Sequence, residues 1–79
     1  MIRISHMNRL PGRVACTFTA TVAGLVLPGC ALIRREDAYG LSVPRIGAPG
    51  ETRPAPLSAV MEAELLRVAM ATYKEKENG

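Results

Sequence analysis

Residues 14–27 read Val-Ala-Cys-Thr-Phe-Thr-Ala-Thr-Val-Ala-Gly-Leu-Val-Leu, and the interpretation of the whole chain depends on this uncharged stretch. Residues 1–13, which precede it, are basic and contain no acidic residue, and Pro11-Gly12 separates the two segments. A basic start followed by a short apolar run is typical of an export signal, because the positive end stays in the cytoplasm while the apolar helix enters the bilayer. The pattern therefore predicts a hydrophobic leader helix in the first part of the chain.

A short motif closes the apolar run. Leu27-Pro28-Gly29-Cys30 resembles the lipobox of bacterial lipoprotein precursors, in which a leucine and two small residues precede a cysteine. The resemblance implies that Cys30 is lipidated and holds the protein in membrane lipid, that Leu27 and Gly29 are recognised at the cleavage site, and that residues 1–29 are removed. Pro28 departs from the Ala or Ser that is usual in this family.

Three other interpretations of this region remain open. Residues 14–33 carry no charge and are long enough to be retained as one transmembrane helix between Arg13 and Arg34. Ordinary secretion would cut after Ala31, where the small residues loosely fit a signal-peptidase site. An organelle transit peptide is the third possibility, although the long uncharged run argues against it.

The charge of the chain is unevenly distributed. Residues 1–13 carry three arginines and no acid, whereas the chain from Arg34 onward carries seven basic and seven acidic residues. The net charge of +3 therefore belongs to the leader. A nucleic-acid-binding protein needs a basic face on its folded part, so the sequence argues against a nucleic-acid partner.

The part of the chain after the leader lacks the residues on which most catalysis depends. The only histidine, His6, and the cysteines Cys16 and Cys30 lie within the leader or at its end. A nucleophile would have to be Ser42 or Ser58 working with a lysine of the C-terminal tail. There is neither a cysteine cluster with metal-ligand spacing nor a glycine-rich phosphate loop. The sequence predicts a protein that is not an enzyme and binds no metal or cofactor.

The chain from Cys30 onward is expected to consist of a spacer and a helix. Residues 34–37 form a charged collar, and residues 38–57 contain seven glycine and proline residues, which exclude a continuous helix or a central strand. Residues 30–57 are therefore predicted to form an extended, lipid-anchored spacer. A body of about 50 residues with few aromatic rings is close to the lower size limit for independent folding. The predicted fold class is mostly α and irregular, without an independent globular core.

Residues 58–79 are predicted to form a C-terminal amphipathic helix with a frayed tail. Pro56 prevents a helix before this point, and Ser58 can cap the first turn. The residues up to Tyr73 are mostly strong helix formers. Because the apolar face is too wide for a helix that stands alone in water, we expect it to bind a protein partner or a second copy. The predicted contact residues are Met61, Leu65, Leu66, Val68, Ala69 and Tyr73.

These expectations combine into a functional hypothesis. The protein would be a small membrane-anchored lipoprotein that acts as an accessory or assembly subunit and docks its C-terminal helix on a larger envelope complex. By the same resemblance, Ala31 in place of an aspartate after Cys30 implies an outer-membrane address facing the periplasm. The alternative is a single-pass small subunit of an inner-membrane complex that keeps residues 14–33 as its helix.

Overall fold

A two-residue turn folds the uncharged run back on itself. The computed structural model describes residues 1–78 and the side chains of residues 1–76. Ala23 and Gly24 have φ angles of 50° and 85°, the left-handed pair that a tight β-hairpin turn requires. The flanking residues pair as antiparallel strands, from Val22 with Leu25 to Val14 with Ile33. The predicted leader helix is therefore wrong, because residues 14–33 form a β-hairpin.

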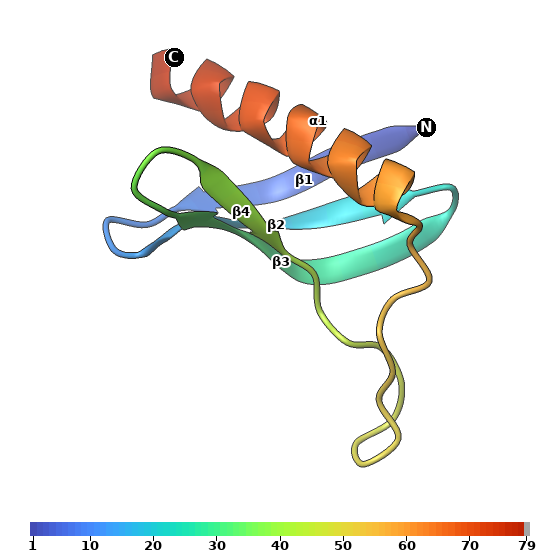
Figure 1. Ribbon diagram of the computed structural model, residues 1–79. Coiled ribbons are helices and arrows are strands. Elements are labelled where there is room, and N and C mark those ends of the chain that lie inside the picture. The colour runs from blue at the N-terminus through green and yellow to red at the C-terminus, as the bar shows by residue number, and fades with distance from the viewer. Residues whose placement is uncertain (79) are drawn as a thin grey trace.

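Two further strands complete one antiparallel sheet, and a helix follows it (Figure 1). The strands lie in the order β1-β2-β3-β4, and the helix lies across one face of the sheet. The elements are β1 (Ile2–Arg9), β2 (Val14–Val22), β3 (Leu25–Arg34), β4 (Tyr39–Ser42) and α1 (Ala59–Asn78). The segment expected to be a removable leader, residues 1–29, supplies β1, β2 and the first half of β3.

Alternating side chains give the sheet one apolar and one polar face. On β2, the residues that point toward α1 are buried, whereas Thr17, Thr19 and Thr21 lie on the opposite face and are only half-buried. A strand places successive side chains on opposite faces, so every second residue is buried from Cys16 to Val22. Ala15, at the register shift between Val14 and Cys16, is buried as well. The buried residues of β2 and β3 include Cys16, Phe18, Ala20, Val22, Leu27, Cys30 and Leu32. The chain thus has a hydrophobic core, and the prediction that it lacks one is wrong.

A β-bulge shifts the register between β1 and β2 by one residue. Ser5 pairs with Thr19 and Asn8 pairs with Thr17, so two residues of β1 stand opposite the single residue between those threonines. His6 has a φ of 55° at this point. The bulge turns Met7 toward the core, where it packs beside the buried residues.

Helix α1 begins where the sequence predicts and ends later. The Ser58 hydroxyl accepts a hydrogen bond from the Met61 amide at 3.1 Å, which confirms the predicted N-cap. Leu65, Ala69 and Tyr73 recur at every fourth position and are buried against the sheet. The helix continues to Asn78, through most of the tail that was expected to fray, and Gly79 lies outside the described residues.

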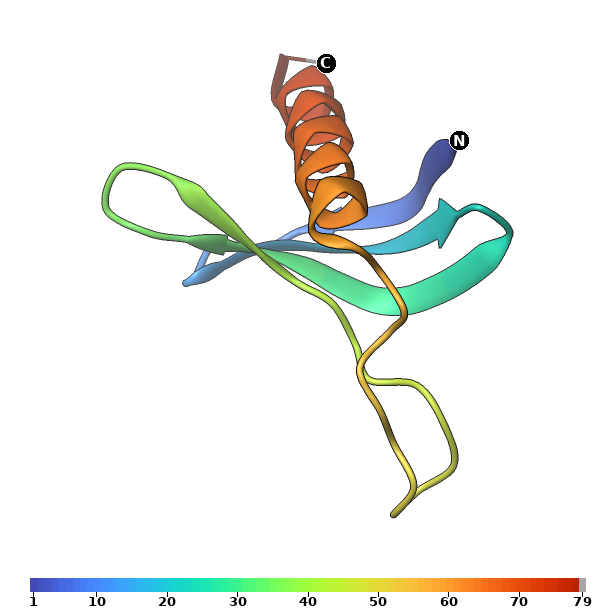
Figure 2. The ribbon, with the colours of Figure 1, turned by 45° about the vertical axis from the view of Figure 1, so that its right-hand side comes forward.

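The connection from β4 to α1 forms an arm on the side of the sheet opposite the helix (Figures 1 and 2). Ile46 and Arg53 form an isolated antiparallel bridge across this arm, and the Arg45 guanidinium donates to Thr52 Oγ1 at 3.1 Å and to the Thr52 carbonyl at 2.8 Å. A Cβ atom on Gly47 would lie 2.7 Å from the Glu51 carbonyl oxygen, so the arm closes only with glycine there. The predicted spacer, residues 30–57, is therefore the second half of β3, the edge strand β4 and a folded arm.

Within residues 1–78, no helix is both long enough and apolar enough to cross a membrane.

Candidate functional site

The outer edge of β4 is available for pairing with another strand. In the sheet order β1-β2-β3-β4, this strand pairs on one side only, with β3. No described segment pairs with its other side, so backbone amide and carbonyl groups along it have no partner in the sheet. Pro44 follows closely and has no amide hydrogen, which limits the free edge to about the length of β4 itself. An open edge of this kind is a template for strand addition.

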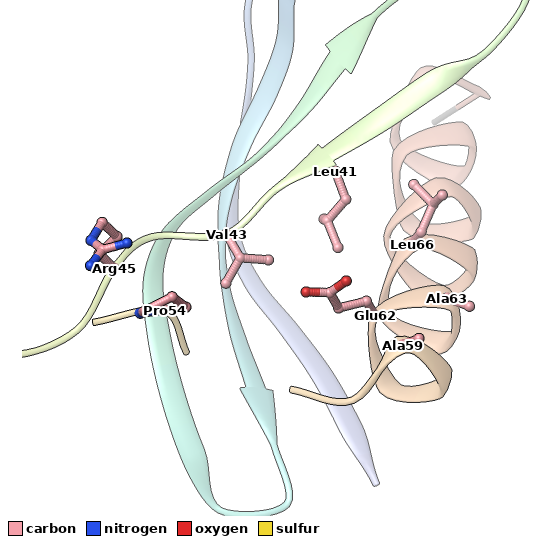
Figure 3. Close-up of a pocket in the computed structure, with 8 residues that line it drawn as sticks. All are labelled: Leu41, Val43, Arg45, Pro54, Ala59, Glu62, Ala63 and Leu66. Carbon is pink, nitrogen blue, oxygen red and sulfur yellow. The ribbon is translucent and has the colours of Figure 1, made fainter. Parts of the chain in front are cut away.

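A groove runs beside this edge, between β4 and the first half of α1 (Figure 3). Leu41 and Val43 project into it from the sheet side, and Leu66 faces them from the helix. Ala59, Ala63 and Pro54 complete the lining with small or rigid apolar groups. Since the two alanines lack long side chains, the groove can receive a side chain from another molecule.

One carboxylate stands in the groove. Glu62 projects from α1 toward Val43, and its carboxylate makes no ion pair or hydrogen bond with the described side chains (Figure 3). Glu62 lies in the first turn of α1, where the positive end of the helix dipole favours an acidic side chain. An unpaired carboxylate between apolar walls also attracts a cation or an amide donor, so the groove combines an apolar floor with one negative charge.

The arm fixes the end of the groove. Arg45 lines the groove, but its guanidinium is already bonded to Thr52 and does not neutralise Glu62. These bonds and the Ile46–Arg53 bridge hold the chain beyond Val43 in an extended form. Contacts within the chain therefore hold the sheet side of the groove in place.

The structure divides the six residues that were predicted to bind a partner. Leu65, Ala69 and Tyr73 are 0%, 0% and 3% exposed, because they contact the sheet of their own chain. Leu66 lies in the groove beside β4, whereas Met61 and Val68 line a second groove on the β1 side of the helix. Most of the apolar face is thus used inside the fold, and only its flanks are available to a partner.

The lipobox-like residues lie in β3. Cys30 is 0% exposed, and its thiol donates to the Leu27 carbonyl at 3.4 Å. Burial raises the pKa of the Cys30 thiol, and it does the same for Cys16 on β2. Gly29, in contrast, is exposed and has a φ of 83°, which an L-residue rarely adopts. Lipidation at Cys30 stays a prediction, and it would act on a chain that has not folded in this way.

Two arginines and a tyrosine form a cluster at the end of the sheet near the C-terminus of α1. Arg34 donates to Tyr73 Oη at 2.9 Å, and Arg9 donates to the same oxygen at 3.3 Å while lying 4.7 Å from the ring centre. The hydrogen bond from Arg9 is the main reason why the pKa of Tyr73 is lowered, and the charge of Arg34 adds to it. Arg34 also donates to the carbonyls of Leu10 and Gly12. Because these contacts join α1 to the sheet and to the β1–β2 loop, we assign the cluster a structural role.

The basic residues of the N-terminal segment bear on whether the protein binds nucleic acid. Arg3 and Arg9 belong to β1, and Arg13 lies in the loop that follows it. Arg3 lies on the face away from α1, and Arg9 contacts Tyr73 on the other face. Arg9 and Arg34 meet at Tyr73, and Arg13, Arg34 and Arg35 line one hollow together with Glu36 and Asp37. The absence of a nucleic-acid partner stays a prediction.

The described residues include no group of three or more His, Cys, Asp or Glu side chains that could hold a metal ion.

Of the residues that line the groove beside β4, only Leu66 was predicted to bind a partner. Leu41 and Val43 fall within the predicted spacer, and Glu62 was not among the predicted contact residues. The available signal was the pair of small residues Ala59 and Ala63, four apart on the same helix face as Leu66.

Comparison with known proteins provides no relative for this chain. No family model, no curated protein and no solved structure matches it. The groove must therefore be interpreted from its own geometry and chemistry.

Proposed function

We propose that the protein is a non-enzymatic binding module that captures an extended segment of another protein by strand addition to β4. The single observation that carries the proposal is the coincidence of an unpaired strand edge with an apolar groove between that edge and a helix. Main-chain hydrogen bonds to an edge supply affinity in this binding mode, and pockets for alternate side chains supply specificity.

The dimensions of the edge define the bound segment. β4 has four residues and is followed by Pro44, so the partner adds a strand of about the same length. In a strand, every second side chain points to the same face. One or two side chains of the segment therefore enter the groove, where Leu41, Val43 and Leu66 contact them.

The charge in the groove defines the chemistry of that segment. Glu62 is the acidic residue of the groove, and Arg45 is held by Thr52. A segment with a β-branched or leucine side chain beside a lysine, an arginine or a free amino terminus would satisfy both the apolar walls and the carboxylate. A segment with an acidic residue at that position would be repelled.

The proposed role as a binding subunit agrees with the expectation from the sequence, but the surface that contacts the partner is a different one. An accessory or assembly subunit remains the proposed role, but the helix contributes one wall of a groove and is not itself the docking surface. The envelope location and the membrane anchor remain proposals that rest on the lipobox-like motif alone.

A peptide selection followed by NMR tests the proposal. A displayed library of random linear peptides is selected on the purified full-length chain, and one enriched peptide is titrated into 15N-labelled protein. We expect enrichment of β-branched residues with a neighbouring Lys or Arg, and chemical-shift changes concentrated in β4, residue 43 and residues 59–66. Leu66→Glu should abolish binding, and Glu62→Lys should reverse the preference so that acidic peptides bind.

Arg53→Glu on the arm is the control for a change of charge, since it alters an exposed position outside the groove lining. Selection without any consensus, shift changes on the threonine face of the sheet, or equal binding by wild type and Leu66→Glu would each overturn the proposal.

A further inference from the structure

A second groove lies on the opposite flank of the helix. It is formed by the start of β1, the β2–β3 turn and the first half of α1, and its apolar residues include Met1, Ile2, Val22, Val60, Met61 and Val68. Val60 is 79% exposed, and Met1 is fully exposed beside it. Large apolar side chains gathered at one exposed place mark an interaction surface.

This groove also borders an open strand edge. β1 pairs with β2 on one side, and no described strand pairs with its other side. The bulge at His6 interrupts the strand, so the regular part of the free edge covers residues 2–5. Ile2 and Ile4 on this edge point toward the helix side, while Arg3 and Ser5 point to the other face.

The charged residues of this groove distinguish it from the groove beside β4. Glu64 and Arg67 form an exposed ion pair on α1, with Arg67 Nε donating to Glu64 Oε2 at 3.2 Å. One residue of each sign, placed three positions apart, is self-complementary when a second copy is related by a two-fold axis. In that arrangement Glu64 of each chain faces Arg67 of the other. In the groove beside β4, Glu62 lies on α1 and Arg45 on the arm, so the two charges do not form such a pair on one helix.

We infer that this surface binds a second copy of the same chain, through antiparallel pairing of the two β1 strands and contact between the two α1 helices. Pairing centred on Ile4 places Ile4 opposite its own copy, Arg3 opposite Ser5 and Ile2 opposite His6 at the bulge, so the arginines are not directly opposed and residues 3–5 form the regular part of the pairing. The result is one continuous sheet of eight strands whose apolar edge residues are covered. The β4 edges remain free at the two ends of that sheet.

A charge-exchange experiment tests this inference on the full-length chain. The oligomeric state is measured by light scattering after gel filtration and by sedimentation over a concentration series, with any tag at the C-terminus because Met1 lines the groove. We expect the wild type to form a dimer. E64R and R67E should each weaken dimerisation at least about tenfold, because like charges then face each other across the axis.

The mixed sample gives the decisive result. E64R carries two cations in the groove and R67E carries two anions, so an equimolar mixture should form a heterodimer although neither chain dimerises well alone. The double variant E64R/R67E should regain the wild-type dissociation constant. R53E is the control for a change of charge outside this surface, and it should dimerise normally.

Val60→Asp provides a second test that does not depend on the ion pair. Asp near the N-terminus of a helix is favourable to the helix, so the variant should keep its fold while becoming monomeric. Circular dichroism verifies the fold. A monomeric wild type at all concentrations, or a mixture of E64R and R67E that stays monomeric, would overturn the inference. Peptide binding beside β4 is measured separately, so either proposal can fail alone.

Discussion

Two adjacent leucines on α1 provide the sharpest test of the fold, because the structure gives them different environments. Leu65 is 0% exposed and contacts the sheet, whereas Leu66 is half-buried at the wall of the groove beside β4. We predict that Leu65→Ala lowers the free energy of unfolding by about 2–5 kcal/mol, as expected for a buried leucine replaced without collapse of the cavity. Leu66→Ala should lower it by only about 1 kcal/mol.

The size of the domain makes this difference easy to measure. A chain of 79 residues has an expected free energy of unfolding of about 4–12 kcal/mol, at about 0.05–0.15 kcal/mol per residue. Leu65→Ala would therefore remove a large part of the stability and leave a substantial unfolded population at the low end of that range.

Urea denaturation followed by far-UV circular dichroism and tyrosine fluorescence gives both free energies, and coincident curves would show a two-state transition. Equal, small effects of the two substitutions would refute the packing of α1 on the sheet. So would a wild-type chain without a cooperative transition, which is what a spacer followed by an isolated helix would show.

Three further predictions concern the hairpin and the cysteines. Ala23→Asn should raise Tm by about 4–8 °C, since Asn tolerates the left-handed conformation of this turn position at less strain than Ala; a lower Tm would contradict the turn geometry. The raised pKa values of Cys16 and Cys30 mean that unfolded thiols lose their protons first, so stability should fall as pH rises above about 8.5. A Cys16→Ala/Cys30→Ala chain should lack that decline. Urea titrations at several pH values measure the free energy of unfolding, and an equal decline with pH in this variant and in the wild type would show that the two thiols are not its cause. The intact mass of the protein from its native source should equal that of the unprocessed chain if this fold forms, whereas loss of residues 1–29 with a gain of acyl groups would support the lipoprotein hypothesis.

The start of the C-terminal helix was predictable because its signals are local. Pro56 and Ser58 define where the helix begins, and the Glu64–Arg67 pair follows from its periodicity. The end of the helix was not predictable in the same way. Tyr73 is held by Arg9 and Arg34 from strands that are distant in sequence, and this contact stabilises the last turns.

The sheet was missed although the sequence carries a signal for it. Thr17, Thr19 and Thr21 alternate with apolar residues, which is the two-residue period of a half-buried strand. The signal is weak because Thr is uncharged, so the stretch also reads as one continuous apolar run of the length of an export signal. Ala23 further conceals the hairpin, since the usual residues of such a turn are Asn or Gly.

The candidate site could not have been found from local patterns. Its lining comes from β4, from the arm and from one flank of α1, and these segments meet only after the sheet has formed. Leu65 and Ala69 lie at the centre of the apolar face and pack on the sheet. Their packing decides which flank of the helix faces outward. A helical wheel alone assigns the whole face to a partner.

Residues 1–30 are interpreted either as an export signal or as strands of the sheet. The two interpretations differ in whether a targeting factor binds the chain before it folds. A targeting factor binds a basic start and an apolar run in an unfolded, newly made chain, whereas the β2–β3 hairpin can close in about 1–10 μs once it is free. The hairpin alone leaves its apolar face open, however, since that face is covered by α1, whose core residues are made last. Residues 35–79 take about 2–9 s to synthesise at about 5–20 residues per second, so the apolar strands stay uncovered for that time. The export hypothesis therefore requires that these residues are captured during synthesis, before α1 can cover the sheet.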